Sequence, residues 1–182
     1  YTNEMITIPL DPTKNAQENA KRYFDKYGKQ KRTFEALSHL IKETKEEIAY
    51  LESVRTALDI ARSEDDLAEI KEELITAGYM RRKYTKKKEK ITSRPMHYIS
   101  SDGYHMYVGK NNLQNEELTF SFANGNDWWF HAKGAPGSHV IVKTGGDELP
   151  DRTFEEAGRL AAYYSKNRGS DKVEIDYVEK KH

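Results

Sequence analysis

Residues 16–61 read AQENAKRYFDKYGKQKRTFEALSHLIKETKEEIAYLESVRTALDIA, and this run decides the first half of the fold. It contains no Pro and a single Gly, Gly28. Its apolar residues fall on two interleaved sevenfold series, whose alternating steps of four and three residues form one stripe along a helix, as in a coiled-coil seam. The series are Tyr27, Phe34, Ile41 and Ile48, and Tyr23, Leu37, Leu51 and Leu58. The sequence therefore predicts one long helix over residues 16–61.

The stripe needs a partner surface. At 1.5 Å per residue, a helix of this span is about 70 Å long, which is too long to be covered by the remaining elements. Gln30, Thr44 and Arg55 interrupt the stripe, and polar residues in a seam commonly fix its register. We expect a coiled-coil partner helix, supplied by an upstream segment of a longer protein or by a second copy of the chain. The alternative is a helix folded back within one globule.

Two segments connect this helix to the second half of the chain. Ser63 followed by three acidic residues is typical of a helix start, and Gly78 of a helix end, so residues 64–77 are expected to form a short helix. Residues 1–80 are then one region built on the long helix. Residues 81–95 form a basic linker, in which eight basic residues accompany the single acid Glu89. Such a charge run is typical of a solvated linker that contacts a polyanion. The linker residues expected to bind RNA are Arg82, Lys83, Lys86, Lys87 and Lys88.

The pattern of residues 96–182 predicts a small mixed α/β sheet module. The whole chain is therefore expected to have an α+β fold, in which a long coiled-coil helix is followed by this module. Apolar alternation interrupted by Gly-rich turns favours strands, and a 3.6-residue period favours helices. The expected elements are a hairpin of residues 96–99 and 104–108, a helix at 111–122, strands at 128–132 and 139–143, a helix at 153–166 and a strand at 172–179. The run 111–122 also fits a strand, because Leu118, Phe120 and Phe122 alternate. Thr153 and Glu156 are expected to form a capping box.

Aromatic and basic side chains gather on the strand at 128–132. Adjacent strand residues face opposite ways, so Trp128 and Trp129 cannot both enter one core. His131 shares a face with Trp129, which makes Trp129 the better candidate for exposure. An exposed Trp beside His131 and Lys133 would stack unpaired bases. The alternative is that a helix covers the outward Trp.

Two glycine-containing turns add candidate phosphate ligands. Gly109 precedes Lys110 and Asn111, where backbone amides and an ammonium group could meet a phosphate at a helix start. Gly137 precedes Ser138, which could do the same through main-chain amides. We expect Lys110, Asn111 and Ser138 to share one RNA-facing rim with the aromatic cluster. Equally, both turns could serve only to reverse the chain.

Several functional classes find little support. The chain has no Cys, so it has no disulfide or thiolate metal site, and its four histidines between His97 and His139 lack a zinc-binding spacing. Ser138 lies beside a His but without a nucleophile-elbow motif. No apolar run approaches the length of a membrane span. With 33% charged residues and a mean hydropathy of -0.93, much of the chain must face solvent. We expect a binding module that is not an enzyme, without cofactor, metal or membrane partner.

The second half of the chain resembles the NFACT-R domain of the bacterial NFACT family, and the first half resembles the coiled-coil middle region of the same family. The motifs that carry the resemblance in the second half are Asp102-Gly103, Val108-Gly109-Lys110-Asn111-Asn112, Gln114-Asn115, Asp127-Trp128-Trp129-Phe130-His131, Pro136-Gly137-Ser138-His139-Val140 and Leu160-Ala161-Ala162-Tyr163-Tyr164-Ser165. In the first half they are Ile8-Pro9-Leu10-Asp11-Pro12 and Asn19-Ala20-Lys21-Arg22-Tyr23-Phe24. Together they cover most of the chain.

The resemblance implies a cytoplasmic ribosome-associated quality-control factor. Family members bind the large ribosomal subunit and its RNA when it carries a stalled peptidyl-tRNA, bind tRNA, and promote addition of C-terminal alanine to the nascent chain. The resemblance also implies that residues 96–182 are a C-terminally truncated RNA-binding module and that the family's amino-terminal domain is missing from this sequence. The same family is described as fibronectin-binding, which implies fibronectin as a second possible partner and a non-classical presence at the cell surface.

Overall fold

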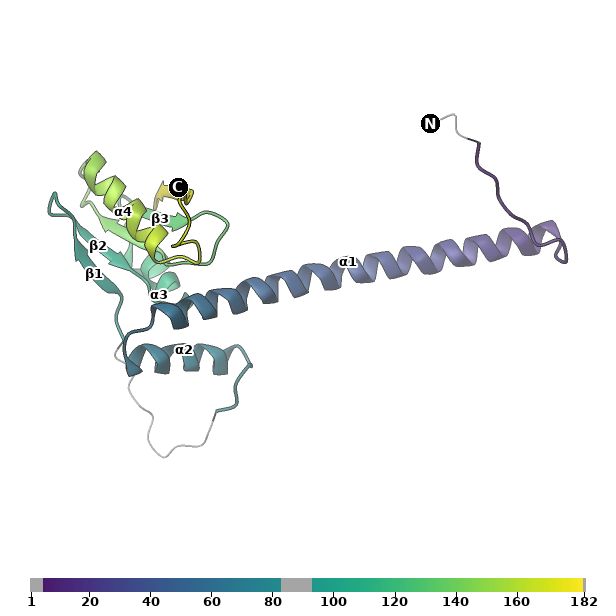
Figure 1. Ribbon diagram of the computed structural model, residues 1–182, viewed down its shortest axis with the longest axis horizontal. Coiled ribbons are helices and arrows are strands. Elements are labelled where there is room, and N and C mark those ends of the chain that lie inside the picture. The colour runs from purple at the N-terminus through teal and green to yellow at the C-terminus, as the bar shows by residue number, and fades with distance from the viewer. Residues whose placement is uncertain (1–4, 83–92, 182) are drawn as a thin grey trace. The chain divides into compact units, whose positions relative to one another are not determined.

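The computed structural model describes residues 5–82 and 93–181, which form a mixed α+β structure. The described elements are α1 (Ala16–Ile60), α2 (Glu64–Thr76), β1 (Met96–Ile99), β2 (His105–Val108), α3 (Asn112–Glu116), η1 (Glu117–Phe122), β3 (Trp128–Ala132), β4 (Val140–Lys143), α4 (Asp151–Tyr163) and β5 (Ile175–Glu179). The chain divides into two compact units, and the boundary lies between Glu47 and Ile48. Figure 1 shows the elements of the second unit around one sheet.

The prediction of one long helix is confirmed, because α1 runs unbroken from Ala16 to Ile60. Its start is fixed by a reciprocal capping box: the Glu18 amide donates to Asn15 Oδ1 at 2.8 Å, and the Asn15 amide donates to Glu18 Oε2 at 3.0 Å. The predicted apolar stripe is exposed to solvent, with Tyr27 at 63% and Phe34 at 72% of their full exposure. Among the described residues, nothing covers this part of the stripe.

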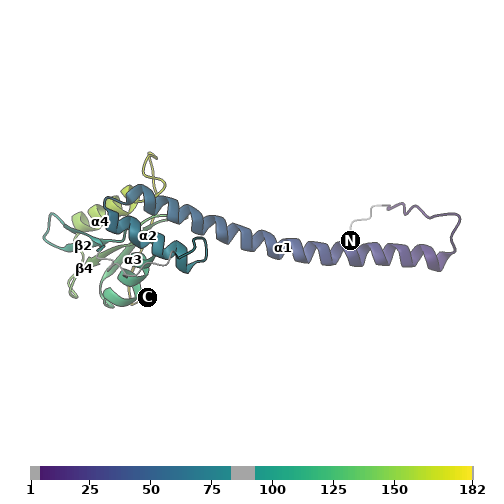
Figure 2. The ribbon, with the colours of Figure 1, turned by 90° about the horizontal axis from the view of Figure 1, so that it is seen from below.

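Helix α2 packs on the last turns of α1, within the second unit (Figure 2). The contact buries Val54 and Ala57 of α1 and Ile70 of α2. Ser63 caps α2 as the sequence predicts, since its side chain accepts a hydrogen bond from the Asp66 amide. The helix ends before Gly78, whose φ of 85° lies in the left-handed region that glycine adopts without strain.

The sheet has five strands in the order β1-β2-β4-β3-β5, and every neighbouring pair is antiparallel. The two predicted strand pairs, 96–99 with 104–108 and 128–132 with 139–143, are confirmed as β1–β2 and β3–β4. Strand β4 also pairs with β2, so the second hairpin returns beside the first. The predicted last strand is shorter than expected and pairs with β3 at the edge of the sheet.

One face of the sheet carries the main core. Phe130, Val140 and Val142 are fully buried there against α4, and Ile60 from the end of α1 joins the same cluster.

The predicted capping box of α4 is wrong. The helix begins two residues earlier, at Asp151, and Thr153 instead turns inward, where its hydroxyl donates to Asp102 Oδ2 at 2.7 Å and lies within hydrogen-bond distance of Ser100 Oγ at 2.9 Å.

The opposite face is partly covered by α3 and η1. The predicted helix at 111–122 is confirmed, but its second half is a six-residue π-helix, Glu117–Phe122. Leu118 is buried beneath it, and Phe122 makes an edge contact with Tyr107 of β2 at a ring separation of 4.7 Å. Short π-helical stretches occur often at functional sites. This face is therefore a candidate binding surface.

Candidate nucleic-acid interface

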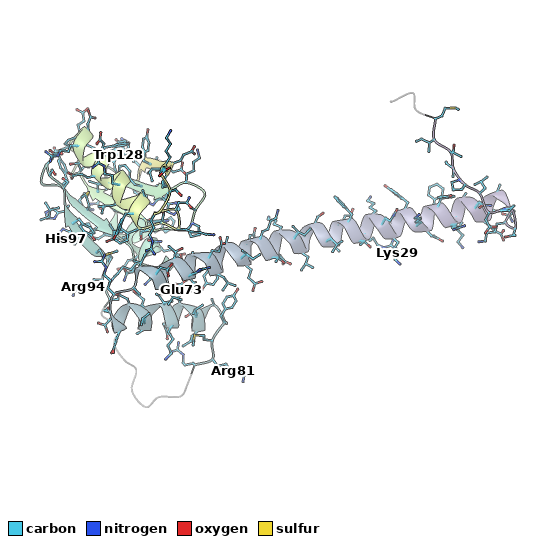
Figure 3. The ribbon with its side chains drawn as sticks, viewed as in Figure 1. Lys29, Glu73, Arg81, Arg94, His97 and Trp128 are labelled. Carbon is cyan, nitrogen blue, oxygen red and sulfur yellow. The ribbon has the colours of Figure 1, made fainter. Side chains whose placement is uncertain are left out.

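A row of five paired residues crosses the face that η1 partly covers. In strand order it consists of His97, Tyr107, Ile141, Trp129 and Val178. Figure 3 labels the first of them on β1, the outermost strand. Ile141 in the middle is fully buried, whereas the residues towards both edges retain exposed surface. The row therefore offers aromatic groups on either side of a covered centre.

Trp129 and Trp128 face opposite sides of the sheet, as the alternation predicts. Trp128 packs towards the core, with Phe154 of α4 at a ring separation of 6.0 Å. Trp129 stacks on His131 at 5.7 Å, and both rings meet His139 edge-on at 5.1 Å. Trp129 is only half exposed, and its Nε1 is buried without a hydrogen-bond partner among the described residues. The exposed platform expected of Trp129 is thus reduced to part of its ring.

The two histidines of this cluster are neutral at physiological pH. Burial lowers the pKa of His131. Burial, and then the charge of His131, lower the pKa of His139 to about 4. Thr119 of η1 holds His139 through a hydrogen bond of 2.8 Å to Nδ1. Neutral imidazoles can exchange hydrogen bonds with a base but add no positive charge to bind phosphate.

A further exposed ring is Phe120, which was not among the site residues predicted from the sequence. It lies on η1 with 73% of its surface exposed, and the Lys180 ammonium lies 5.5 Å from its ring centroid. Next to it, the Lys143 ammonium lies 4.7 Å from the Phe122 ring. An exposed ring beside a cation can stack an unpaired base and attract its phosphate. The alternation of Leu118, Phe120 and Phe122 in the sequence was the available signal, but it did not reveal which ring points outward.

The structure does not place Lys110, Asn111 and Ser138 on the exposed rim that the sequence predicts. Lys110 retains 13% of its side-chain exposure and forms an ion pair with Asp66 of α2. Asn111 is the N-cap of α3 and donates to Glu69 Oε2 at 2.7 Å. Ser138 is 1% exposed, and its amide donates to the Tyr164 carbonyl at 2.9 Å. The expectation of exposure is wrong for all three residues.

The turn of residues 109–112, here called the Lys110 turn, does contact anionic groups, as its composition suggested. These groups are carboxylates of α2 in the same chain. Three acids of α2, Asp66, Glu69 and Glu73, hold Lys110, Asn111 and Asn112 respectively. Gly109 allows the turn to approach α3 closely, because a Cβ at this position would overlap the Asn115 side chain. The turn therefore fastens α2 to the sheet module.

The remaining predicted site residues differ in how far the structure describes them. Lys133 is 58% exposed, with Glu174 at 3.7 Å, and it follows the strand that carries Trp129 and His131. Arg82 forms an ion pair with Glu72 on the surface of α2. Lys83, Lys86, Lys87 and Lys88 lie outside the described residues. The candidate interface consequently comprises Trp129, His131 and Lys133 together with Phe120 and Lys180.

The described residues form neither a metal-binding cluster nor a membrane-spanning helix. No three His, Asp or Glu side chains converge in a metal-binding arrangement within residues 5–82 and 93–181. Over the same residues, no helix is both long and apolar enough to cross a bilayer. The geometry of an exposed ring, partly exposed aromatic residues and nearby ammonium groups is that of a protein which contacts nucleic acid.

Comparison with known families agrees with this class. Residues 94–182 match the NFACT protein RNA binding domain, and residues 1–93 match the NFACT N-terminal and middle domains. The chain belongs to the NFACT family.

Individual relatives extend the comparison. The Rqc2 homolog RqcH of Streptococcus pneumoniae (strain D39) is 47% identical over 184 residues, which cover the whole of this chain and 32% of that protein. RqcH of Bacillus subtilis is 41% identical over 97% of this chain and 31% of its own length. The solved C-terminal part of the fibronectin/fibrinogen-binding protein from Streptococcus suis is 46% identical, with a TM-score of 0.80 over 91% of this chain and 66% of that one. The chain thus spans about a third of the length of these curated relatives.

Proposed function

We propose that this chain is the RNA- and ribosome-binding part of a ribosome-associated quality-control factor, and that it has no enzymatic activity of its own. The observation that carries the proposal is the match of residues 94–182 to the family's RNA-binding domain. The names of the RqcH relatives and of the Drosophila ribosome quality control complex subunit NEMF homolog support the same process. The exposed Phe120 with the Lys180 ammonium near its ring, and the Trp129 ring, supply chemistry suited to unpaired RNA.

In the intact cytoplasmic protein, the proposed task is to bind the large subunit that carries a stalled peptidyl-tRNA, with contacts to its RNA and to tRNA. This binding would support C-terminal alanine tailing of the nascent chain. The exposed stripe of α1 would pair with another helix, either from an upstream segment or from a second copy. Co-sedimentation of the intact protein with large ribosomal subunits tests the proposal, which fails if the protein stays in the supernatant at physiological salt.

A second candidate function, binding to fibronectin at the cell surface, rests on the description of the Streptococcus suis neighbour as a fibronectin/fibrinogen-binding protein. The two functions differ in salt dependence. RNA affinity should fall steeply with added salt because binding releases counterions from phosphates. Parallel titrations with tRNA, ribosomal RNA and immobilised fibronectin therefore separate them. Tight binding to fibronectin alone would favour the second candidate.

The basic linker is expected to contribute to RNA binding, and this contribution can be tested. Replacing Arg82, Lys83, Lys86, Lys87 and Lys88 by Gln should weaken RNA binding and reduce the slope of log affinity against log salt by up to about 3.5, at about 0.7 per single-strand phosphate contact. Folding should change little, since solvated charges contribute little stability. Filter binding at several salt concentrations measures the slope. A matched control removes five charges from α1 at Lys26, Lys29, Lys31, Arg32 and Lys42, and an equal slope change in both variants would contradict the linker's role.

The exposed Phe120 ring of η1 provides a second testable contribution to RNA binding. Replacing Phe120 by Ala should lower affinity for single-stranded RNA by about 5-fold to about 150-fold, because stacking of one base contributes about 1–3 kcal/mol. Stability should be nearly unchanged, since 73% of the ring is already exposed. Fluorescence anisotropy with a labelled oligonucleotide measures the affinity. Tyr163 on α4, which is 61% exposed on another face, is the control for Ala substitution, and equal losses at both positions would argue against a specific platform.

A further inference from the structure

A pocket of about 430 Å³ lies on the second unit and reaches the aromatic cluster at His139, whose ring contacts Trp129. Its walls come from the last turns of α1, the end of α2 and the start of α3, together with His139 of the β3–β4 turn. The side chains that decide its chemistry are those of Tyr50, Glu73, Leu113, Glu116 and His139. Two of these five are acidic, and none of the described residues that line the pocket is Lys or Arg. We call this the Glu73 pocket.

Two polar atoms in its wall are buried without a hydrogen-bond partner among the described residues, the Glu73 Oε2 and the Tyr50 hydroxyl. Glu73, labelled in Figure 3, lies on α2. Its side chain is only 6% exposed. Its other oxygen accepts from Asn112 Nδ2 at 2.7 Å, and the same amide donates to Ser53 Oγ at 2.8 Å, so the carboxylate is held in place. A buried acceptor left unpaired costs about 1–3 kcal/mol, and more when it is charged. A ligand that donates to Oε2 would recover this cost.

None of the described residues that line the pocket places a Lys or Arg side chain opposite Glu73. Burial, and then the charge of Glu73, raise the pKa of Tyr50 to about 12, so the phenol stays protonated, although it completes no hydrogen bond of normal geometry with the carboxylate. His139 is neutral because burial depresses its pKa. The Tyr50 ring is fixed by stacking on Tyr79 at 5.6 Å. The pocket therefore combines a fixed aromatic wall, an unpaired carboxylate oxygen and the exposed acid Glu116.

We propose that the Glu73 pocket binds the guanidinium group of an arginine side chain from a partner polypeptide. A planar cation can donate to Glu73 Oε2, lie against the Tyr50 ring and approach Glu116 at the rim. Phosphate-bearing ligands are opposed by both carboxylates, which separates this site from the RNA surface around Phe120. The pocket adjoins the RNA surface through His139, whose ring contacts Trp129 and His131, but the groups proposed to bind the guanidinium, Glu73, Tyr50 and Glu116, lie outside that surface, so arginine binding and RNA binding can be measured separately.

The test uses N-acetyl-arginine amide as the probe and N-acetyl-citrulline amide as its neutral isostere, titrated into the 182-residue chain and followed by NMR. We expect saturable shifts at Leu113 and His139 with the arginine derivative, and affinity at least about tenfold weaker for citrulline. Glu73→Gln keeps the shape and the contact with Asn112 but removes the charge, so it should weaken arginine binding by a similar factor. Glu155→Gln on α4, outside the pocket, should have no effect.

Glu116→Gln guards against a folding defect at position 73, since Glu116 is an exposed residue of the rim. It should weaken arginine binding several-fold without altering the rest of the spectrum. Equal affinity for arginine and citrulline derivatives would overturn the proposal, as would unchanged arginine affinity in a folded Glu73→Gln or Glu116→Gln variant. Guanosine serves as a third probe. If it shifts the same resonances while the arginine derivative does not, the pocket is a nucleobase site and the proposal is wrong.

Discussion

Replacing Asp66 by Ala should destabilise the second unit by about 3–5 kcal/mol, the usual cost of removing one partner from a buried ion pair. Asp66 is 2% exposed and is the shared acceptor where α2 meets the sheet module. It forms the ion pair with Lys110, accepts from the Arg62 amide at 3.0 Å, and accepts from Ser93 Oγ at 2.8 Å. Its loss leaves the Lys110 ammonium buried and uncompensated. Urea unfolding followed by tryptophan fluorescence reports on this unit, because both Trp residues lie in it.

Three comparisons make this prediction specific. Glu64→Ala on the exposed side of the same helical turn should cost much less. The Asp66→Ala change should cost less when Lys110 is already Met, and strictly additive costs would contradict the pair. Burial alone would raise the pKa of Asp66, but hydrogen bonds from Lys110, Arg62 and Ser93 and the charge of Lys110 lower it to about 2 from an ordinary 3.8. The carboxylate's contribution is therefore full above about pH 4 and lost as pH falls through 2, so Asp66→Asn should flatten that part of the stability profile.

Replacing the two adjacent tryptophans should give opposite phenotypes. Trp128→Ala should cost about 3–5 kcal/mol of stability, because the ring packs against Phe130, Phe154 and Tyr177. Trp129→Ala should leave the unit folded but lower RNA affinity about tenfold, since its ring is half exposed beside His131. Thermal unfolding and RNA anisotropy measured on both variants test the assignment.

The control for the two tryptophan variants is replacement of each tryptophan by Phe. Trp129→Phe keeps a stacking surface and should recover most of the affinity, whereas Trp128→Phe should recover most of the stability. A Trp129→Ala protein that unfolds would make this ring part of the core. One that binds RNA as tightly as the original would remove it from the interface and leave Phe120 as the remaining aromatic platform.

The sequence predicts those parts of the fold that depend on local periodicity. The sevenfold stripe gave α1 to within one residue at its C-terminus, and alternation with glycine turns gave both strand pairs. The placement of Lys110 could not be predicted in this way. Its ion-pair partner Asp66 lies 44 residues earlier, and nothing local indicates that α2 packs on this turn. Thr153 was misassigned for a similar reason, because its hydroxyl partners Ser100 and Asp102 are about 50 residues away.

The candidate site shows the same division. Strand alternation separated Trp128 from Trp129 correctly, since it depends only on adjacent positions. The exposure of Phe120 depends on a π-helix, and the pattern of Leu118, Phe120 and Phe122 does not predict one. Burial of both histidines, which keeps them neutral, likewise arises only after the segments assemble.

The family's two sequence segments meet between residues 93 and 94, yet the compact unit begins at Ile48. Ile60 of α1 completes the core beneath α4, and α2 is fastened to the Lys110 turn by three acids. Recombination that joined residues 94–182 to an unrelated helix would leave an unfilled site in that core and a buried lysine without its counterion. The two segments therefore depend on each other for stability, and a substitution on one side of the junction should change the stability effect of a substitution on the other.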